Sequence, residues 1–367
     1  MTVMNITNHS NGLQAMRGGK AVGLALQGGG SWGAYAWGVL DTLLQCPEIV
    51  VTQMSGTSAG ALNAAIVASA LAKGSRKQAR EALTSFWGRV ANPPTADLMR
   101  AMMGSLGRHW RSSVGNWLMA SEAFSVPGVH ALGVNPLRDV VAAHVDIEAI
   151  RGDSAPALFV TATNVRTGLP RVFSNADMSV DALLASACLP HMFPTVEIDG
   201  EHYWDGGYTG NPTLWPMIRS GLAKDLILVQ LMPEGLDDLP LDAPSIRRRV
   251  GQIVFNSSIG AEMQALVALR ELAAQPGARA KAPDVRMHRI GPPHLELFEE
   301  GSGSDRGVAW LKLLNEEGAA AGRRFLSHHL IDVGIRETLD IARVFFDPRD
   351  SRVGVPQSLQ LPTTSAS

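Results

Sequence analysis

Two glycine-framed turns near the N-terminus constrain the fold of this chain more than any other feature of its sequence. The first covers residues 28–33 (GGGSWG) and the second covers residues 56–60 (GTSAG). Each turn follows an apolar run typical of a buried strand and precedes a run with helical spacing. These flanking segments are, in chain order, Ala21–Gln27, Ala34–Leu44, Ile49–Met54 and Ala59–Ala72. Repeated strand–turn–helix units predict a parallel sheet that helices cover on both faces.

The same alternation continues to about Met232 and then changes to long helical patterns. The later segments are an expected strand, helix and strand, followed by two long helices: Ala157–Ala162, Val180–Ala187, Leu226–Leu231, Ile246–Ala274 and Ser304–Phe325. We therefore predict an α/β domain with a helical C-terminal extension. The expected organisation is a flexible N-terminus at 1–19, the α/β domain at 20–232 with a cap or insertion at 92–135, the extension at 233–346 and a disordered tail at 347–367.

Composition excludes several classes of protein. The chain has 32 Lys and Arg against 34 Asp and Glu, so no overall basic field favours nucleic acid as a partner. Two cysteines, Cys46 and Cys188, do not make a disulfide framework. The first 20 residues lack the apolar stretch of a secretory signal, and no run of about 18 apolar residues predicts a membrane span. These features predict a cytoplasmic protein, with peripheral membrane contact and non-classical secretion left open.

The first turn has two interpretations, and the second turn favours one of them. A Gly-x-Gly-x-x-Gly loop ending at Gly33 suits either a dinucleotide or an oxyanion. The nucleotide reading needs an acid about 20 residues further on, where Glu48 lies. The second turn places Ser58 between Gly56 and Gly60, which is the Gly-x-Ser-x-Gly pattern of a nucleophile elbow. Nucleotide binding leaves that serine unexplained, so we favour acyl transfer.

A nucleophilic serine needs a general base and donors for the oxyanion. Consecutive glycines at Gly28, Gly29 and Gly30 can turn backbone N–H groups toward one point. The candidate base is Asp205, in the sequence YWDGGY at residues 203–208. Aromatic neighbours there predict partial desolvation, which raises the pKa of a carboxyl group toward the working range of a base.

These three motifs, in this order and spacing, resemble those of the patatin-like phospholipases. The resemblance covers about residues 20–232 and includes the glycines after the aspartate, Gly206 and Gly207. It implies a three-layer α/β/α patatin-like sandwich with a mainly parallel sheet. It also implies hydrolysis of lipid carboxylic esters without metal or cofactor, with Ser58 as nucleophile, Asp205 as general base and the first glycines as oxyanion hole. The extension, with FNSS at residues 255–258, also looks like one found on some bacterial members.

One residue departs from the family pattern. Many members have arginine or lysine just before the last glycine of the first loop, where this chain has Trp32. Without the basic residue, no cation at this position lies near the oxyanion or a substrate phosphate. This departure favours a neutral ester as substrate.

Other readings stay open at this point. An ordinary hydrolase order would place a histidine after the acid, and the candidates are His288, His294, His328 and His329. The remaining alternatives are a polyester depolymerase and a lipid-binding relative without catalytic activity.

Overall fold

The computed structural model describes residues 19–92, 135, 137–190, 192–236, 238–279, 281–293 and 305–346. The predicted N-terminal segment at 1–19 lies outside the described residues except for residue 19, and the predicted cap at 92–135 does so except for residues 92 and 135. The predicted tail at 347–367 lies outside them entirely.

The described strands form one mixed sheet of eight strands, in the order β5-β6-β3-β2-β1-β7-β8, with β4 paired to β3. Neighbours are parallel along the run from β3 to β8, while β4, β5 and β6 form the antiparallel part. The strands are β1 (Lys20–Leu26), β2 (Ile49–Thr57), β3 (Ala157–Asn164), β4 (Pro170–Phe173), β5 (Val196–Ile198), β6 (Glu201–Asp205), β7 (Asp225–Val229) and β8 (Arg286–Ile290). The predicted mainly parallel sheet is confirmed.

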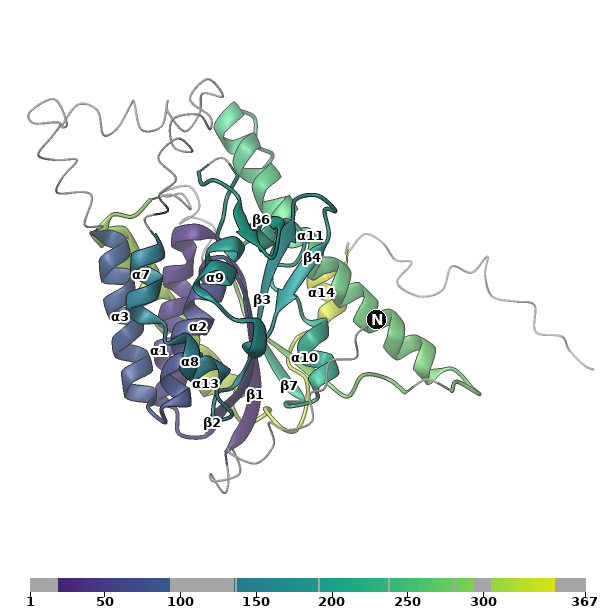
Figure 1. Ribbon diagram of the computed structural model, residues 1–367. Coiled ribbons are helices and arrows are strands. Elements are labelled where there is room, and N and C mark those ends of the chain that lie inside the picture. The colour runs from purple at the N-terminus through teal and green to yellow at the C-terminus, as the bar shows by residue number, and fades with distance from the viewer. Residues whose placement is uncertain are drawn as a thin grey trace, which may run out of the picture.

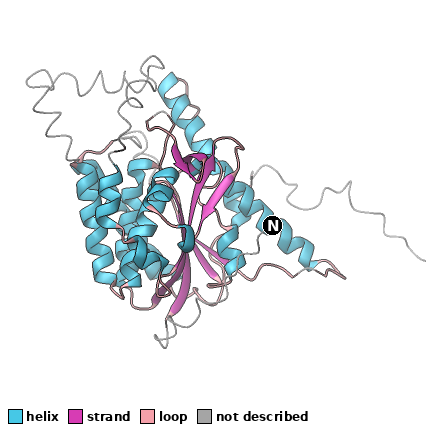
Figure 2. Ribbon diagram, viewed as in Figure 1, coloured by secondary structure: helices cyan, strands magenta, loops and turns pink. Residues whose placement is uncertain are grey.

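Helices cover both faces of this sheet, which gives three layers (Figures 1 and 2). One face carries α1 (Gly33–Gln45), α2 (Ala59–Ala72), α3 (Arg76–Ala91), α7 (Leu137–His144), α8 (Ile147–Arg151), α9 (Val180–Ser186) and α13 (Val308–His329). The other face carries α10 (Trp215–Ser220), α11 (Ala243–Ala274) and α14 (Ile341–Phe345). Short 3-10 turns are η1 (Gly30–Trp32), η4 (Asn175–Asp177) and η5 (Gly206–Tyr208).

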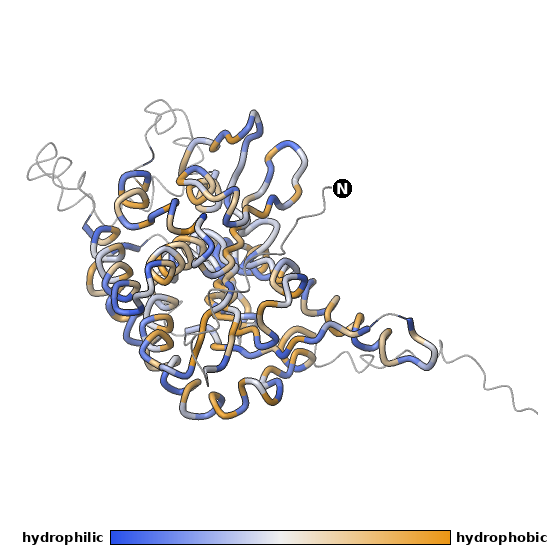
Figure 3. Tube along the Cα trace, turned by 60° about the horizontal axis from the view of Figure 1, so that its bottom comes forward, coloured by the Kyte–Doolittle hydropathy of each residue, from blue (hydrophilic) through white to orange (hydrophobic). Residues whose placement is uncertain are grey.

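The alternation of side chains along β1 explains the two-sided core. Val22, Leu24 and Leu26 pack into the apolar cluster beneath α1, α2 and α13, whereas Ala25 belongs to the cluster beneath α10 and α11. Because both faces of the strand are buried from Val22 onward, its sequence is apolar after Lys20. In the hydropathy view, orange segments accordingly gather in the middle of the molecule (Figure 3).

The region after residue 233 completes the sheet as well as adding helices. The two long helices expected there are present as α11 and α13, and α13 packs closely along α1. A Cβ atom at Gly38 of α1 would collide with the Asn315 carbonyl, and one at Gly318 would collide with the Tyr35 carbonyl. Strand β8, which pairs with β7, was not predicted from the sequence, because its segment RMHRI is short and contains two arginines.

Candidate active site

Ser58 occupies a strained turn between the end of β2 and the start of α2. Its backbone has φ 54° and ψ −126°, a conformation that costs energy for a residue with a side chain. The Ser58 N–H donates to Ser186 Oγ at 2.9 Å. A Cβ atom at Gly28 would lie 2.8 Å from Ser58 Cβ and 2.6 Å from the Thr57 carbonyl oxygen, so the two glycine-framed turns touch directly.

The register of the sheet brings Asp205 to the same place. Thr57 of β2 pairs with Thr161 of β3, and Ala162, the next residue of β3, pairs with Asp205 of β6. Ser58 and Asp205 therefore lie on either side of β3 at matching positions, although the sequence separates them by 147 residues. Asp205 ends β6, and its Oδ1 atom accepts the Gly207 N–H at 2.7 Å.

Asp205 is fully buried, and this burial controls its acidity. Burial raises the pKa of Asp205 to about 7, while hydrogen bonding to the Ser58 side chain and the Gly207 N–H opposes the rise. Its Oδ2 atom nevertheless has no hydrogen bond of normal geometry with the described residues. The contact between Asp205 and the Ser58 side chain is therefore less well aligned than a normal hydrogen bond. The raised pKa agrees with the expectation from the sequence.

The first glycine turn is held by Asn211, a residue that the sequence analysis did not single out. The Gly28 N–H donates to Asn211 Oδ1 at 2.6 Å, and Asn211 Nδ2 donates to the carbonyl oxygens of Gly28 and Phe255. The Gly28 amide, one of the three predicted oxyanion donors, is therefore engaged within the protein. The amides of Gly29 and Gly30 form no hydrogen bond within the described part of the chain, and Gly30 has φ 62°.

The FNSS segment of α11, residues 255–258, holds Asn211 and the residue before the first glycine turn. Asn256 Oδ1 accepts from Gln27 Nε2 at 2.8 Å, and Ser258 Oγ accepts the Asn211 N–H at 2.9 Å. Phe255 packs against Tyr208 and fills the space that a Cβ atom at Gly207 would need. The C-terminal region therefore positions both the first glycine turn and the turn after Asp205.

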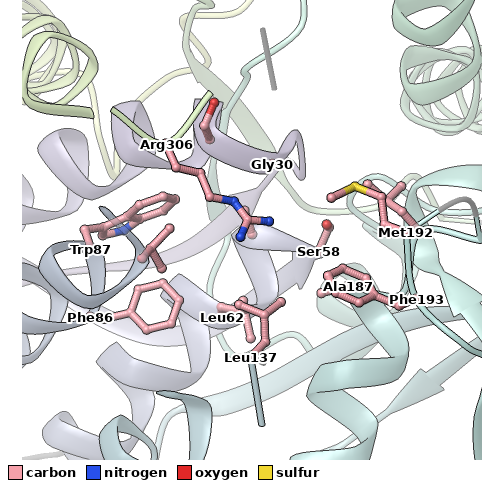
Figure 4. Close-up of a pocket in the computed structure, with 14 residues that line it drawn as sticks. Gly30, Ser58, Leu62, Phe86, Trp87, Leu137, Ala187, Met192, Phe193 and Arg306 are labelled. Atoms are coloured by element: carbon pink, nitrogen blue, oxygen red, sulfur yellow. The ribbon is translucent and has the colours of Figure 1, made fainter. Parts of the chain in front are cut away.

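Ser58 opens into a pocket with mainly apolar walls (Figure 4). Its walls are formed by residues of α2, α3 and α7, by the segment after α9 and by the first glycine turn. Arg306, which lies just before α13, completes them. The wall residues are Gly30, Ser31, Ala59, Leu62, Phe86, Trp87, Val90, Leu137, Ala187, Leu189, Met192, Phe193 and Arg306. Apolar walls beside a serine hydroxyl are suited to an acyl chain whose carbonyl carbon lies at the hydroxyl.

Trp32 is buried, so its side chain does not take an exposed position in place of the basic residue found in many family members. Its ring meets the Trp310 ring edge-to-face, with centroids 5.2 Å apart and an interplanar angle of 82°. Trp310 Nε1 also donates to Ser31 Oγ at 3.4 Å. The residue that departs from the family pattern therefore joins the first glycine turn to α13.

The histidines considered for a catalytic triad are placed elsewhere, as far as the structure describes them. His288 lies on β8 between Asp225 Oδ1, at 3.0 Å, and Thr338 Oγ1, at 2.8 Å, outside the pocket that Ser58 lines. His328 and His329 end α13, and His294 lies outside the described residues. No described histidine lines the Ser58 pocket.

No group of three or more His, Cys, Asp or Glu side chains in the described ranges has the arrangement of a metal site. None of the helices in those ranges combines the length and the apolar character that crossing a bilayer requires.

The chain is similar to solved structures of bacterial proteins, at low identity. It resembles VipD from Legionella pneumophila with a TM-score of 0.41 and 14% identity, covering 85% of this chain and 67% of that one. It resembles the type III effector ExoU with a TM-score of 0.31 and 15% identity, covering 82% of this chain and 53% of that one. The ExoU–SpcU complex from Pseudomonas aeruginosa gives 0.26 and 16%, covering 68% and 52%.

These likenesses are too distant to carry an argument about function, and no curated protein matches the sequence. A family model gives the stronger result. The model described as "Patatin-like phospholipase" matches residues 24–218, which is 195 of the 367 residues and includes both glycine-framed turns and Asp205. The chain belongs to the patatin-like phospholipase family, whose members are lipid acyl hydrolases.

Proposed function

We propose that this protein hydrolyses carboxylic esters of lipids through an acyl–enzyme intermediate on Ser58, with Asp205 as the general base. The observation that carries the proposal is the meeting of a serine in a strained strand–helix turn with a buried aspartate whose pKa is raised to about 7. A base with that pKa is half ionised near neutral pH, where it can accept the proton of a hydroxyl group as the hydroxyl attacks.

In the first half of the reaction, Ser58 Oγ attacks the ester carbonyl carbon while Asp205 Oδ2 takes the hydroxyl proton. The negative charge on the carbonyl oxygen is stabilised by the Gly29 and Gly30 amides and by the N-terminus of α2. When the tetrahedral intermediate breaks down, the C–O bond to the alcohol breaks and Asp205 returns the proton to the departing oxygen. The acyl group remains on Ser58 as an ester.

In the second half, water takes the place of the alcohol. Asp205 accepts a proton from the water as its oxygen attacks the acyl carbon, and then returns that proton to Ser58 Oγ as the fatty acid leaves. The base is regenerated and no metal or cofactor takes part in the sequence. We propose that the protein reaches its lipid substrates through peripheral contact with a lipid surface, which sedimentation with phospholipid vesicles would test.

A fluorophosphonate probe tests the proposed nucleophile. The folded wild-type protein should be labelled, and Ser58→Ala should not be. Ser186→Ala is a useful comparison, because Ser186 Oγ contacts the Ser58 backbone and should not itself react. Absence of labelling in a folded wild-type protein would instead favour a lipid-binding protein without catalytic activity.

The substrate range is tested with the purified protein on a panel of lysophospholipids, diacyl phospholipids, glycerides and polyesters. Release of fatty acid that Ser58→Ala and Asp205→Asn both abolish is the expected result. A phospholipase A or lysophospholipase activity is the more specific form of this proposal, and a polyester depolymerase is its competitor in the panel.

A further inference from the structure

Arg306 is the one charged side chain among the described residues that line the Ser58 pocket. In Figure 4, its guanidinium group extends into the pocket and points toward Ser58. The neighbouring walls are apolar, with Trp87 and Phe86 from α3 and Leu62 from α2. A guanidinium group in such surroundings has given up much of its hydration.

The charge of Arg306 has no ionic or hydrogen-bonding partner in the described part of the chain. The adjacent acid, Asp305, is exposed, and its Oδ1 atom accepts the Gly307 N–H at 2.9 Å. Burial lowers the pKa of Arg306, but an arginine remains protonated at neutral pH. An unpaired and partly buried cation is costly to maintain unless an anionic ligand satisfies it.

Arg306 is also held at a fixed place relative to the first glycine turn. It lies two residues before α13, and the first turns of that helix are anchored by the Trp32–Trp310 ring contact. The buried side chain of Leu311 follows immediately, in the core cluster shared with α1. The arginine is therefore attached to the same turn that supplies the free Gly29 and Gly30 amides.

We propose that Arg306 binds the phosphate group of the lipid whose ester reacts at Ser58, so that the C-terminal region selects phosphate-bearing substrates. This inference rests on the proposed hydrolase function and adds a substrate-selecting residue to it. The residue would contact the substrate headgroup without taking part in proton transfer.

The chemistry of the two groups supports this assignment. In a glycerophospholipid, the phosphate is joined to the ester-bearing carbons through the glycerol backbone, only a few bonds away. A guanidinium group forms paired hydrogen bonds with phosphate oxygens, and such charge-assisted bonds gain strength in a pocket with little water. A neutral glyceride offers no anion, so it would leave the partly buried cation without a partner.

The first test compares two substrates with the same acyl chain, decanoyl lysophosphatidylglycerol and monodecanoylglycerol. We expect Arg306→Gln to lower the ratio of their kcat/KM values at least about tenfold, and Arg306→Lys to recover part of it. Arg323→Gln is the matched control, because Arg323 is an exposed arginine on α13, and its ratio should equal that of the wild type. An unchanged ratio in Arg306→Gln would refute the proposal.

The second test measures binding without catalysis. In a Ser58→Ala background, a short-chain ether lysophosphatidylglycerol should bind at least about tenfold more tightly than the corresponding ether glycerol, and Arg306→Gln should remove that difference. Equal binding of the two ether lipids to Ser58→Ala would overturn the assignment. The assignment would also be overturned if Arg306→Gln lost inhibition by decanoate but kept the phospholipid preference, because the arginine would then bind the product carboxylate.

The two proposals fail in different ways. If the wild-type protein hydrolyses neither ester, the hydrolase proposal fails, while the ether-lipid binding still reports on Arg306. If both esters are hydrolysed and the ratio of their kcat/KM values does not change in Arg306→Gln, the hydrolase proposal stands and the phosphate assignment is wrong.

Discussion

Asn211 Oδ1 accepts the Gly28 N–H at 2.6 Å, and this bond fixes the first glycine turn. Asn211 is fully buried and is held in turn by Phe255 and Ser258 of α11. The free amides of Gly29 and Gly30 therefore depend on a contact 183 residues away in sequence.

We expect Asn211→Ala to lower both stability and activity. Leaving the buried Gly28 N–H without an acceptor should reduce the free energy of unfolding by about 1–3 kcal/mol. Displacement of the glycine turn should lower kcat at least about tenfold, because one oxyanion donor is worth more than that. Urea unfolding and steady-state kinetics measure the two effects. Ser258→Ala keeps the Gly28–Asn211 bond and should have the smaller effect on kcat; the reverse order would contradict this role.

The pKa of Asp205 predicts the pH dependence of catalysis. Because the ionised carboxylate is the proposed base and burial raises its pKa to about 7, kcat/KM for a neutral ester should rise about tenfold per pH unit below pH 7 and level off above it. A pH–rate profile with an uncharged substrate measures this limb. A limb centred near the ordinary aspartate value of about 4 would contradict the proposed base.

The same pKa predicts how stability depends on pH. A carboxyl group whose folded pKa lies above its unfolded value holds its proton more tightly when folded, so stability should fall as pH rises from about 4 to about 7 and then stay level. Asp205→Asn carries no charge, so its stability relative to the wild type should increase over that interval, by up to about 4 kcal/mol. Chemical unfolding at pH 4, 6 and 8 tests this, and a pH-independent difference would count against a buried, ionising Asp205.

Asp225 should show the opposite pH dependence. Although burial raises the pKa of Asp225, hydrogen bonds from Arg286, the Gly334 N–H and His288 outweigh it and lower the pKa to about 2. Its stabilising effect should be complete above about pH 4 and lost as pH falls toward 2. Asp225→Asn should therefore cost a few kcal/mol at pH 7, as expected when one partner of a buried ion pair is removed, and much less at pH 2. Thermal unfolding across this range measures the difference.

The Trp32–Trp310 contact should couple the first glycine turn to α13. A double-mutant cycle with Trp32→Ala and Trp310→Ala should give a coupling energy of about 0.5–1.5 kcal/mol, the usual value for an edge-to-face aromatic pair. Trp310→Phe keeps an aromatic ring but loses the N–H that Ser31 accepts, so it should be less disruptive than Trp310→Ala. Additive single-mutant effects would show that the two rings are energetically independent.

The sequence by itself determined the layered α/β fold and the local form of both turns. Ala59–Ala72 is helical from end to end, as its alanine-rich sequence predicts, and the strands before the two turns lie within a residue or a few of their expected positions. These features follow from short-range causes: apolar runs that need burial on both faces, and glycines where the turns touch each other. Motif order was enough to associate Ser58 with Asp205.

Only the tertiary structure decided which groups are available around Ser58. Whether the Gly28 amide is free depends on Asn211, and whether a cation reaches the pocket depends on Arg306, far beyond the glycine turns in sequence. The pKa of Asp205 likewise depends on complete burial by elements from several parts of the chain. The aromatic neighbours of Asp205 in the sequence predicted the direction of its pKa shift. Hydrogen-bond competition, the extent of desolvation and charge placement are properties of the packed molecule, so a local pattern around a motif does not determine them.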